Sequence, residues 1–226
     1  MRERPGCNAV RFTGDYSSTH RLADGTLVRL RLLRRADREQ LVAAFDRLSP
    51  ESRYRRFFTA MPRLPEKLLR RLFDIDGWNH VAIGAETVTA DPAEAEGVGI
   101  ARFIRLKDQP AVAEAAVTVV DHMQRRGLGK LLVSALAQAA RERGITRFRA
   151  EVLRTNEAMQ ALLHEIDETA QPAVDGPLAT YDLVLPEPSP EEPMTGPLYG
   201  LLRLAAAGLQ VVLRRLGHPT EPRSGA

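Results

Sequence analysis

The sequence predicts a mixed α/β sandwich, in which helices cover both faces of a mostly antiparallel sheet. Residues 26–32 alternate between apolar and polar side chains, which is typical of a half-buried strand. Residues 78–85 and 98–104 form two further strand-like stretches, joined by an acidic, turn-rich loop. From residue 113 to 153 the pattern changes to strand, long helix and strand, the order of a crossover connection. Together these features favour an α+β sheet over a doubly wound parallel sheet.

The first part of the chain supplies three predicted helices. Residues 1–24 show no periodicity, and we expect them to form a flexible N-terminus. Apolar residues at helical spacing predict an amphipathic helix over 37–48. Ser49 is a favoured helix cap and is followed by proline, which suits the first helical position, so a second helix begins there. A third, short helix is expected over 65–73.

The later elements follow from similar signals. A strand over 113–120 leads into a glycine-containing loop, and a long helix begins at Leu128. This helix should end near Gly144, because glycine accepts the left-handed conformation that closes many helices. The remaining predictions are a strand at 148–153, a helix at 157–166 and a strand at 181–185.

The composition divides the chain into one folded domain and its appendages. We expect the domain to cover residues 25–185, followed by a stiff proline-rich linker at 186–197. Residues 198–216 predict an amphipathic helix that docks on its own domain, forms a homodimer or lies on a membrane surface. Insertion into a membrane is disfavoured because arginines interrupt this segment. Residues 217–226 should form a disordered tail, and the absence of a signal peptide predicts a cytoplasmic protein.

Charge is unevenly distributed although the net charge is only +3. The first 72 residues contain 17 basic and 8 acidic side chains, whereas residues 73–193 contain 11 basic and 20 acidic ones. Such asymmetry can mark a nucleic-acid partner. We favour the alternative that the basic and acidic parts pack together, and we expect no nucleic-acid partner. The single cysteine, Cys7, and five scattered histidines predict neither a disulfide framework nor a metal site.

The most informative stretch is the loop Gln124–Lys130, which we call the anion loop. A strand that stops at this loop and restarts as a helix leaves free backbone N–H groups directed at one point, where the helix dipole favours negative charge. Arg125, Arg126 and Lys130 can add three cations. The expected ligand is therefore a diphosphate or polyphosphate. The spacing is that of neither a P-loop nor a dinucleotide fingerprint.

The spacing Gln-x-x-Gly-x-Gly resembles the acyl-coenzyme A pyrophosphate loop of the GCN5-related N-acetyltransferase (GNAT) family. A strand at 148–153 followed by Asn156 and Met159 matches a second segment of that family. The stretches 48–58 and 113–115 resemble the acetyltransferase domain of bacterial protein lysine acetyltransferases. The resemblance covers about residues 25–185 and implies a GNAT fold with acetyl-CoA as co-substrate.

The resemblance also implies which residues contact the cofactor. The backbone of Val117 and Val119 would pair with the pantetheine arm and donate hydrogen bonds to the thioester carbonyl oxygen. Asn156 would bind the arm near its thiol end. The pyrophosphate would contact the anion loop, namely Gln124, Arg125, Arg126, Gly127, Leu128, Gly129 and Lys130.

Glu114 is the candidate general base. It is the one carboxylate in an otherwise apolar strand, so we expect the fold to remove part of its hydration, which tunes a carboxylate for proton transfer near neutral pH. The matching glutamate has this role in the lysine acetyltransferases that the chain resembles. The alternative is a strand glutamate that faces water or pairs with an arginine. His122 and Glu151 are weaker candidates, and His80 is expected to be structural.

Two departures from the family pattern stand out. Many members carry a tyrosine, as a general acid, where this sequence has Leu163, and residues 163–168 lack the usual Leu-Gly-Phe-type turn. The leading hypothesis is transfer of an acetyl group from acetyl-CoA to a protein lysine or a small amine. The alternative is a catalytically silent acyl-CoA-binding module that acts through its C-terminal helix. A basic nucleic-acid module ranks last.

Overall fold

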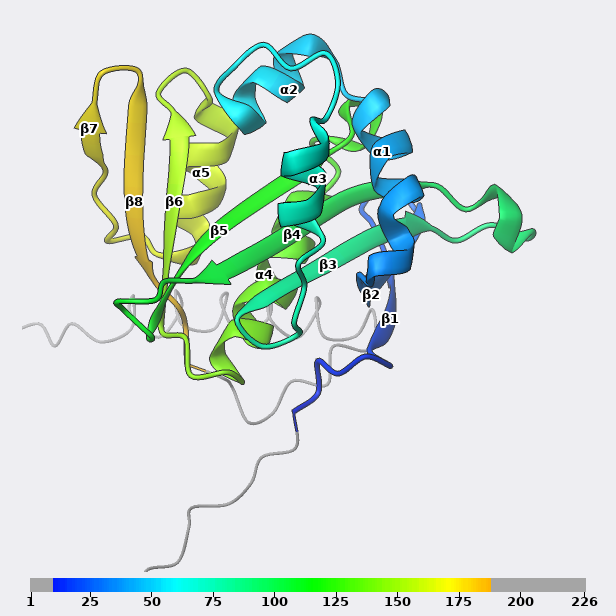
Figure 1. The fold of residues 1–226 in the computed structure, drawn as a ribbon, viewed down its shortest axis with the longest axis horizontal. Coiled ribbons are helices and arrows are strands. Elements are labelled where there is room, and N and C mark those ends of the chain that lie inside the picture. Colours follow the sequence, from blue (N-terminus) through cyan, green and yellow to red (C-terminus); the bar gives the residue numbers. More distant parts are fainter. Residues whose placement is uncertain (1–9, 188–226) are drawn as a thin grey trace, which may run out of the picture. The chain divides into compact units, whose positions relative to one another are not determined.

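The computed structural model describes residues 10–187, which form five α-helices and one eight-stranded sheet (Figure 1). The helices are α1 (Arg38–Asp46), α2 (Pro50–Phe57), α3 (Glu66–Leu72), α4 (Leu128–Arg141) and α5 (Glu157–Ile166). The strands are β1 (Ser17–Arg21), β2 (Leu27–Leu32), β3 (His80–Thr87), β4 (Gly97–Arg105), β5 (Val112–Val119), β6 (Arg147–Leu153), β7 (Ala173–Asp175) and β8 (Leu178–Val184).

The sheet has the order β1-β2-β3-β4-β5-β6-β8-β7. Every neighbouring pair is antiparallel except β5 and β6, which are parallel because α4 carries the chain across between them. The predicted mixed, mostly antiparallel sheet with one crossover is thus confirmed.

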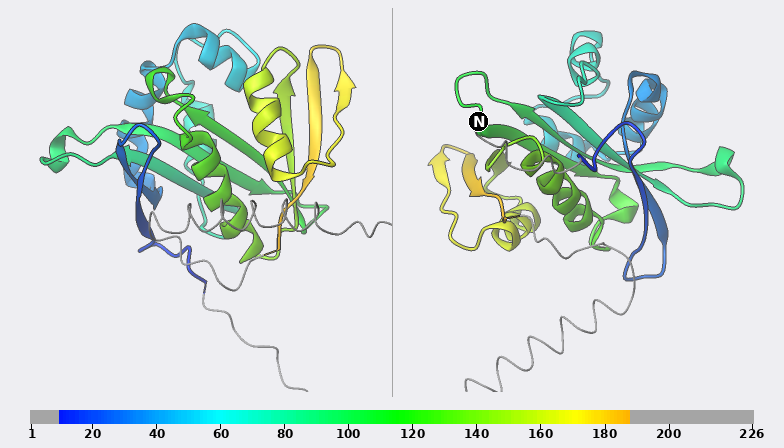
Figure 2. Two further views of the ribbon diagram at one scale, coloured as in Figure 1. Left: turned by 180° about the vertical axis from the view of Figure 1, so that it is seen from behind. Right: turned by 90° about the horizontal axis from the view of Figure 1, so that it is seen from below.

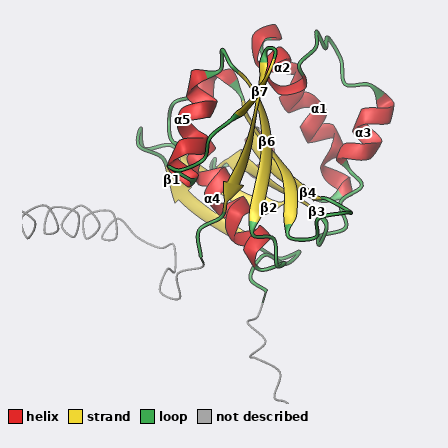
Figure 3. Cartoon of the chain, turned by 90° about the vertical axis from the view of Figure 1, so that its left-hand side faces the viewer, coloured by secondary structure: helices red, strands yellow, loops and turns green. Residues whose placement is uncertain are grey.

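Helices cover both faces of the sheet, as predicted. Helices α1, α2 and α3 lie on one face, and α4 and α5 lie on the other (Figures 1 and 2). Figure 3 shows the sheet between these two sets of helices. The arrangement follows from sequence periodicity, because each amphipathic helix must bury its apolar side against the sheet.

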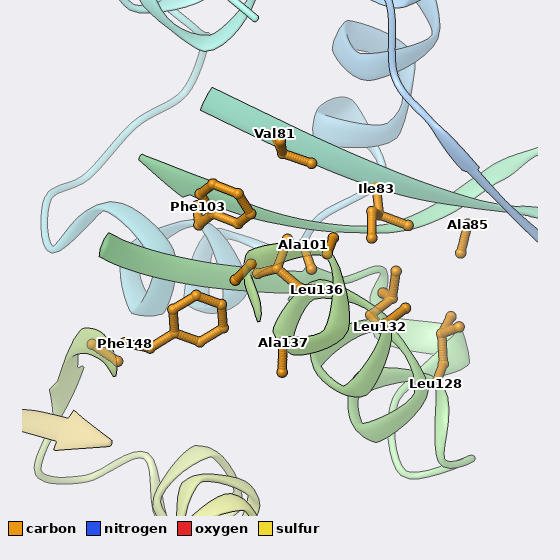
Figure 4. Close-up of a cluster of buried hydrophobic side chains, with 14 of the residues drawn as sticks. Val81, Ile83, Ala85, Ala101, Phe103, Leu128, Leu132, Leu136, Ala137 and Phe148 are labelled. Atoms are coloured by element: carbon orange, nitrogen blue, oxygen red, sulfur yellow. The ribbon is translucent and has the colours of Figure 1, made fainter. Parts of the chain in front are cut away.

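The core lies mainly between α4 and the central strands. Leu128, Leu132 and Leu136 recur along one side of α4 and are each at most 1% exposed. Figure 4 shows them beside residues of β3, β4 and β6, among them Ile83 and Phe103. Each buried leucine contributes roughly 1.5–3 kcal/mol. This packing fixes the beginning of α4, and with it the anion loop, against the sheet.

The helices and strands predicted within residues 25–187 are all confirmed, with their ends shifted by a few residues. Ser49 caps α2 as expected, since its Oγ accepts a hydrogen bond from Ser52 N at 3.1 Å. Gly144 follows α4 with a φ of +75°, the left-handed conformation predicted for that helix end.

The prediction of a flexible N-terminus is wrong for residues 10–24. Strand β1 lies within this segment, and Phe12 is fully buried. The carbonyl oxygen of Phe12 accepts a hydrogen bond from Arg143 Nη2 at 2.6 Å. The strand was missed because its sequence, Ser-Ser-Thr-His-Arg, has no apolar alternation, and it is held by backbone pairing with β2. Strand β7 was missed for a related reason, because its three residues are all exposed.

The predictions made for the C-terminal part fall largely outside the described residues. This applies to the linker beyond residue 187, to the helix at 198–216, to the tail at 217–226 and also to Cys7. Between residues 10 and 187, none of the helices has the length and apolar character that a membrane crossing requires.

Candidate functional site

The site begins where β5 and β6 separate. The two strands pair only at their first three positions, Val112–Glu114 with Arg147–Arg149. Beyond Glu114 they diverge, and Figure 1 shows the two arrows opening from a common lower end. The β6-facing backbone of residues 115–119 is therefore left without a neighbouring strand. An unpaired strand edge offers hydrogen-bonding groups to an extended ligand.

The register of β5 identifies which backbone groups face this opening. Val120 N donates to Val98 O at 3.0 Å, so the even-numbered residues of this stretch bond to β4. Hydrogen bonding alternates along an antiparallel pair, and the N–H and C=O groups of Val117 and Val119 therefore point into the opening. Gln124 Nε2 occupies one of these groups, Val119 O, at 3.0 Å. The N–H groups of both valines face the cavity, the direction that pairing with an extended ligand would require.

A cavity of about 580 Å³ fills the opening and extends to both faces of the sheet. Its volume lies within the usual range for small-molecule sites. On the side of α4 and α5, its lining includes Val117, Val119, Gln124, Arg125, Gly127, Gly129, Lys130 and Asn156. On the side of α2, its lining includes Ser52, Arg55, Arg56, Phe58, Arg102, Ile104 and Glu114.

The anion loop has the geometry of an anion site. Arg125 and Gly127 both adopt positive φ angles, +59° and +87°, which turn the chain sharply into α4. The N–H groups of Leu128, Gly129 and Lys130 have no acceptor among the described residues. Because they open a helix of 14 residues, the helix dipole adds positive potential at the same point. The side chain of Leu128 is buried in the core, so only its backbone is offered to a ligand.

The three cations of the loop differ in their surroundings. Arg125 is exposed and lines the cavity. Lys130 also lines it, but its Nζ pairs with Glu165 Oε2 from α5 at 2.7 Å. Arg126 does not line the cavity, because its Nη1 pairs with Asp24 Oδ2 in the β1–β2 turn at 2.5 Å. The expected side-chain contact of Arg126 with a diphosphate is thus not supported by this arrangement.

A hydrogen-bonded brace, which no sequence signal had indicated, joins the anion loop to α2. Asp121 Oδ1 accepts from the Oγ atoms of Ser49 and Ser52, each at 2.8 Å. Gln124 Nε2 then donates to Ser52 Oγ at 3.2 Å. Burial acts to raise the pKa of Asp121, but hydrogen bonds from Ser49, Ser52 and the loop backbone outweigh it, and the pKa is lowered. The carboxylate therefore stays ionised and holds the two elements together.

Glu114 lies at the point where the strands part, and its side chain lines the cavity. It is exposed, so the prediction that the strand would remove part of its hydration is wrong for this structure. The residue beside it in β6 is Arg149, which bonds to Asp182 Oδ1 at 2.8 Å. Glu114 has no hydrogen bond or ion pair within the described residues that would occupy its carboxylate.

The other candidate residues lie in less suitable places. His122 is exposed and does not line the cavity, whereas Glu151 lines it from β6. His80 is buried outside the cavity, and its Nδ1 lies 3.0 Å from Asp74 O. Burial, together with the nearby charge of Arg102, lowers the pKa of His80, which favours the neutral ring. Within residues 10–187, no group of three or more His, Cys, Asp or Glu side chains is placed to hold a metal.

The helix α5 completes the cavity. Asn156 caps it, with Oδ1 accepting from Met159 N at 3.3 Å, and its Nδ2 has no acceptor within residues 10–187. Leu163 is buried at the position where many GNAT members carry tyrosine, and no tyrosine of the described chain lines the cavity. The missing turn at the helix end is replaced by Asp167, whose Oδ2 accepts from Val184 N of β8 at 2.9 Å.

These features fit an acyl-coenzyme A. The free N–H groups and Arg125 suit a pyrophosphate, and Gly127 leaves open space where other residues carry a Cβ. The separated strands suit an extended pantetheine arm. The α2 side of the cavity was missed as a functional surface, although the stretch 48–58 carried part of the resemblance.

Comparison with known proteins agrees with this geometry. The sequence model described as the acetyltransferase (GNAT) family matches residues 50–166. The chain is 33% identical over 141 residues to Acetyltransferase PA5475 of Pseudomonas aeruginosa, covering 62% of this chain and 74% of that protein. It is 36% identical over 119 residues to Acetyltransferase Pat of Mycolicibacterium smegmatis, covering 52% of this chain but only 34% of that longer relative.

A solved structure shows the same fold. The GNAT domain of PAT from S. lividans superposes with a TM-score of 0.67 at 31% sequence identity. The match covers 75% of this chain and 97% of that domain.

Proposed function

The chain belongs to the acetyltransferase (GNAT) family, whose members use acetyl-CoA, and from this premise we propose that it acetylates an amine by direct attack, with Glu114 as general base. The observation that carries the proposal is the cavity between β5 and β6, which ends at the free N–H groups of α4. Acetyl-CoA supplies an activated acetyl group on a thioester.

The anion loop would hold the pyrophosphate. The N–H groups of Leu128, Gly129 and Lys130 donate hydrogen bonds, and Arg125 adds a cation from the rim of the cavity. Gln124 instead uses its amide to fix the loop against β5 and α2. Arg126 fixes the loop from the other side through Asp24.

The β5 edge would hold the reacting end. The N–H of Val117 is directed into the opening and can stabilise negative charge that develops on the carbonyl oxygen. The N–H of Val119 and the Nδ2 group of Asn156 would position the arm. A carbonyl held this way is presented to an amine arriving from the side of α2, where Glu114 lies.

Glu114 would accept the proton that the attacking ammonium must lose. Its carboxylate makes no hydrogen bond or ion pair in the described residues and faces the cavity. Water can connect it to an acceptor amine, because the side chain is exposed. Since none of the described tyrosines lines the cavity, the thiolate would leave without a tyrosine general acid.

Replacing Glu114 by glutamine tests this assignment. We expect Glu114→Gln to lower kcat for thiol release by roughly 10²- to 10⁴-fold, the usual contribution of a general base. Binding of coenzyme A, measured by calorimetry, should stay within about twofold because the pyrophosphate and arm contacts are unchanged. The matched control is Glu151→Gln, a carboxylate from the β6 wall of the same cavity.

Two results would contradict the proposal in different ways. Equal kcat values for wild type and Glu114→Gln would remove Glu114 from the role of base. Coenzyme A binding without thiol release to any amine would favour the silent acyl-CoA-binding module. The observation that favours the silent module is Leu163, which stands where many members of the family carry a tyrosine.

A further inference from the structure

Two arginines on the α2 side of the cavity have no acidic partner in the part of the chain that the structure describes. Arg102, on β4, is only 6% exposed, and its guanidinium makes one hydrogen bond, from Nη1 to Leu72 O at 3.1 Å. Arg56, on α2, is partly buried and stacks on the ring of Phe57 at 4.9 Å. Neither guanidinium contacts a carboxylate within residues 10–187.

Two arginines without an acidic partner in the described residues cost free energy of folding. Burial lowers the pKa of Arg102 to about 9, and the neighbouring charge of Arg56 contributes to the shift. Burial also lowers the pKa of Arg56 to about 10. Elsewhere in the same sheet a partly buried arginine is neutralised, as Arg31 is by Asp37 and Glu86. A buried cation and a partly buried cation that repel each other are stable only when other interactions offset the cost.

The position of the pair relates it to the reacting groups. In the β4–β5 register, Arg102 lies opposite Ala116, which directly precedes Val117. Glu114, two residues earlier on β5, lies on the same face of the sheet. Arg56 and Arg102 both line the 580 Å³ cavity on that face. A small molecule whose amine is near Glu114 would therefore place its other end toward the two guanidinium groups.

We propose that Arg56 and Arg102 form a carboxylate-binding subsite, and that the acetyl acceptor is a small amine carrying a carboxylate, such as an amino acid. The inference rests on the proposed function. A carboxylate between two guanidinium groups would neutralise the buried charge and accept several charged hydrogen bonds. It would also set the distance between the recognised group and the attacking nitrogen.

A purely structural role and a protein acceptor each account for less of this arrangement. Arg102 supports the C-terminal end of α3 through Leu72 O, where a cation is favourable, but this does not explain why Arg56 is beside it. An acidic side chain on the surface of a protein substrate would have to reach a guanidinium that is 6% exposed. A free carboxylate on a small acceptor can enter the cavity without that obstacle.

The test compares amino acids with their amides as acceptors. Each pair has the same amines, and only the amino acid has the carboxylate. With acetyl-CoA and wild-type protein, thiol release should show a higher kcat/KM for the amino acid of at least one pair. In Arg102→Met and Arg56→Met, the ratio of amino acid to amide should fall by about 10- to 100-fold, the worth of a charged hydrogen bond. Comparing ratios between variants cancels differences in amine reactivity within a pair.

Controls separate recognition from folding. Arg71→Met, an exposed arginine on α3, should leave the ratio unchanged. Arg102→Lys keeps the charge and should restore part of the preference where Arg102→Met loses it. If Arg102→Met does not fold, Arg56→Met and Arg102→Lys still report the ratio. Calorimetry of the preferred amino acid, titrated into protein saturated with free coenzyme A, gives a second readout that does not depend on turnover.

The outcomes are distinct. No thiol release with either series would overturn the subsite, and it would overturn the proposed acetyl transfer as well only if a lysine-containing peptide also gave no release. Equal kcat/KM for amino acids and amides, unchanged in the arginine variants, would leave acetyl transfer intact and overturn the subsite alone. A higher kcat/KM with succinyl-CoA than with acetyl-CoA, measured with the amides as acceptors, would assign the arginines to the acyl chain. This result would likewise overturn the acceptor proposal. Loss of the amino-acid preference in both methionine variants would support it.

Discussion

Gly127 provides the sharpest test of the anion loop, because its conformation and its surroundings can be separated. Its φ of +87° is one that residues with a Cβ rarely adopt, yet a Cβ built there would meet nothing within 4 Å. Gly127→Ala therefore introduces backbone strain and no collision. A left-handed residue with a Cβ costs about 1–2 kcal/mol. If the loop relaxes to relieve the strain, its N–H groups lose their common direction.

The expected loss of coenzyme A affinity follows from that strain. We expect the wild-type protein to bind coenzyme A with a micromolar Kd, a binding free energy of about −8 kcal/mol. A loss of about 1–2 kcal/mol from this free energy corresponds to a roughly 5- to 30-fold increase in Kd. Calorimetry with free coenzyme A measures this change. Gly127→Glu should weaken binding further, because a carboxylate would face the pyrophosphate.

Gly144 supplies the matched control at the other end of α4. Its φ is +75°, and a Cβ there also meets nothing within 4 Å, so Gly144→Ala carries similar strain away from the cavity. Both variants should lower the midpoint of thermal unfolding, but only Gly127→Ala should weaken coenzyme A binding. Equal Kd values for the two variants would refute the idea that the loop conformation carries the affinity.

Two further predictions concern the charges around the loop. The pKa of Asp121 is lowered in the folded state by hydrogen bonds that outweigh burial, so its stabilisation is present above about pH 4, the unfolded value, and is lost as the pH falls through the lower folded value. Asp121→Asn should therefore cost about 1 kcal/mol at pH 7 in urea unfolding and flatten the decline in stability below pH 4; an unchanged decline would contradict this. Glu165→Gln frees Lys130 from its 2.7 Å ion pair and should tighten coenzyme A binding by about two- to fivefold, an effect that should shrink in roughly 0.5 M salt. Weaker coenzyme A binding by Glu165→Gln would instead show that Glu165 favours coenzyme A binding.

Much of the fold was predictable because periodicity and capping act locally. The Ser49 cap, the Gly144 helix end and the crossover from β5 through α4 to β6 each follow from a few neighbouring residues. Strand β1 was not predictable in this way, since its polar residues are held by pairing with β2 and by the burial of Phe12.

The site was predictable where it depends on backbone and less so where it depends on side-chain partners. The spacing of the glycines predicted free N–H groups at the start of α4, and the family resemblance pointed to Val117 and Val119, whose N–H groups face the opening in the structure. No local signal shows that Arg126 pairs with Asp24, 102 residues earlier in the chain. The exposure of Glu114 depends likewise on how far β5 and β6 diverge, which is decided by tertiary packing.

The asymmetry of the cavity links the two proposals. Under the proposed function, its α4 side would bind by backbone N–H groups, which would recognise a diphosphate whatever thioester is attached. Its α2 side offers side chains, among them Arg56, Arg102 and Glu114, and so is the part that can distinguish one amine from another. The brace joins these sides, because Asp121 accepts from Ser49 and Ser52 at the start of α2 and Gln124 of the anion loop donates to Ser52. We therefore expect a change in the loop to affect the helix that carries Arg56. Acceptor selectivity should consequently respond to Asp121→Asn even though Asp121 contacts neither the acceptor nor the thioester.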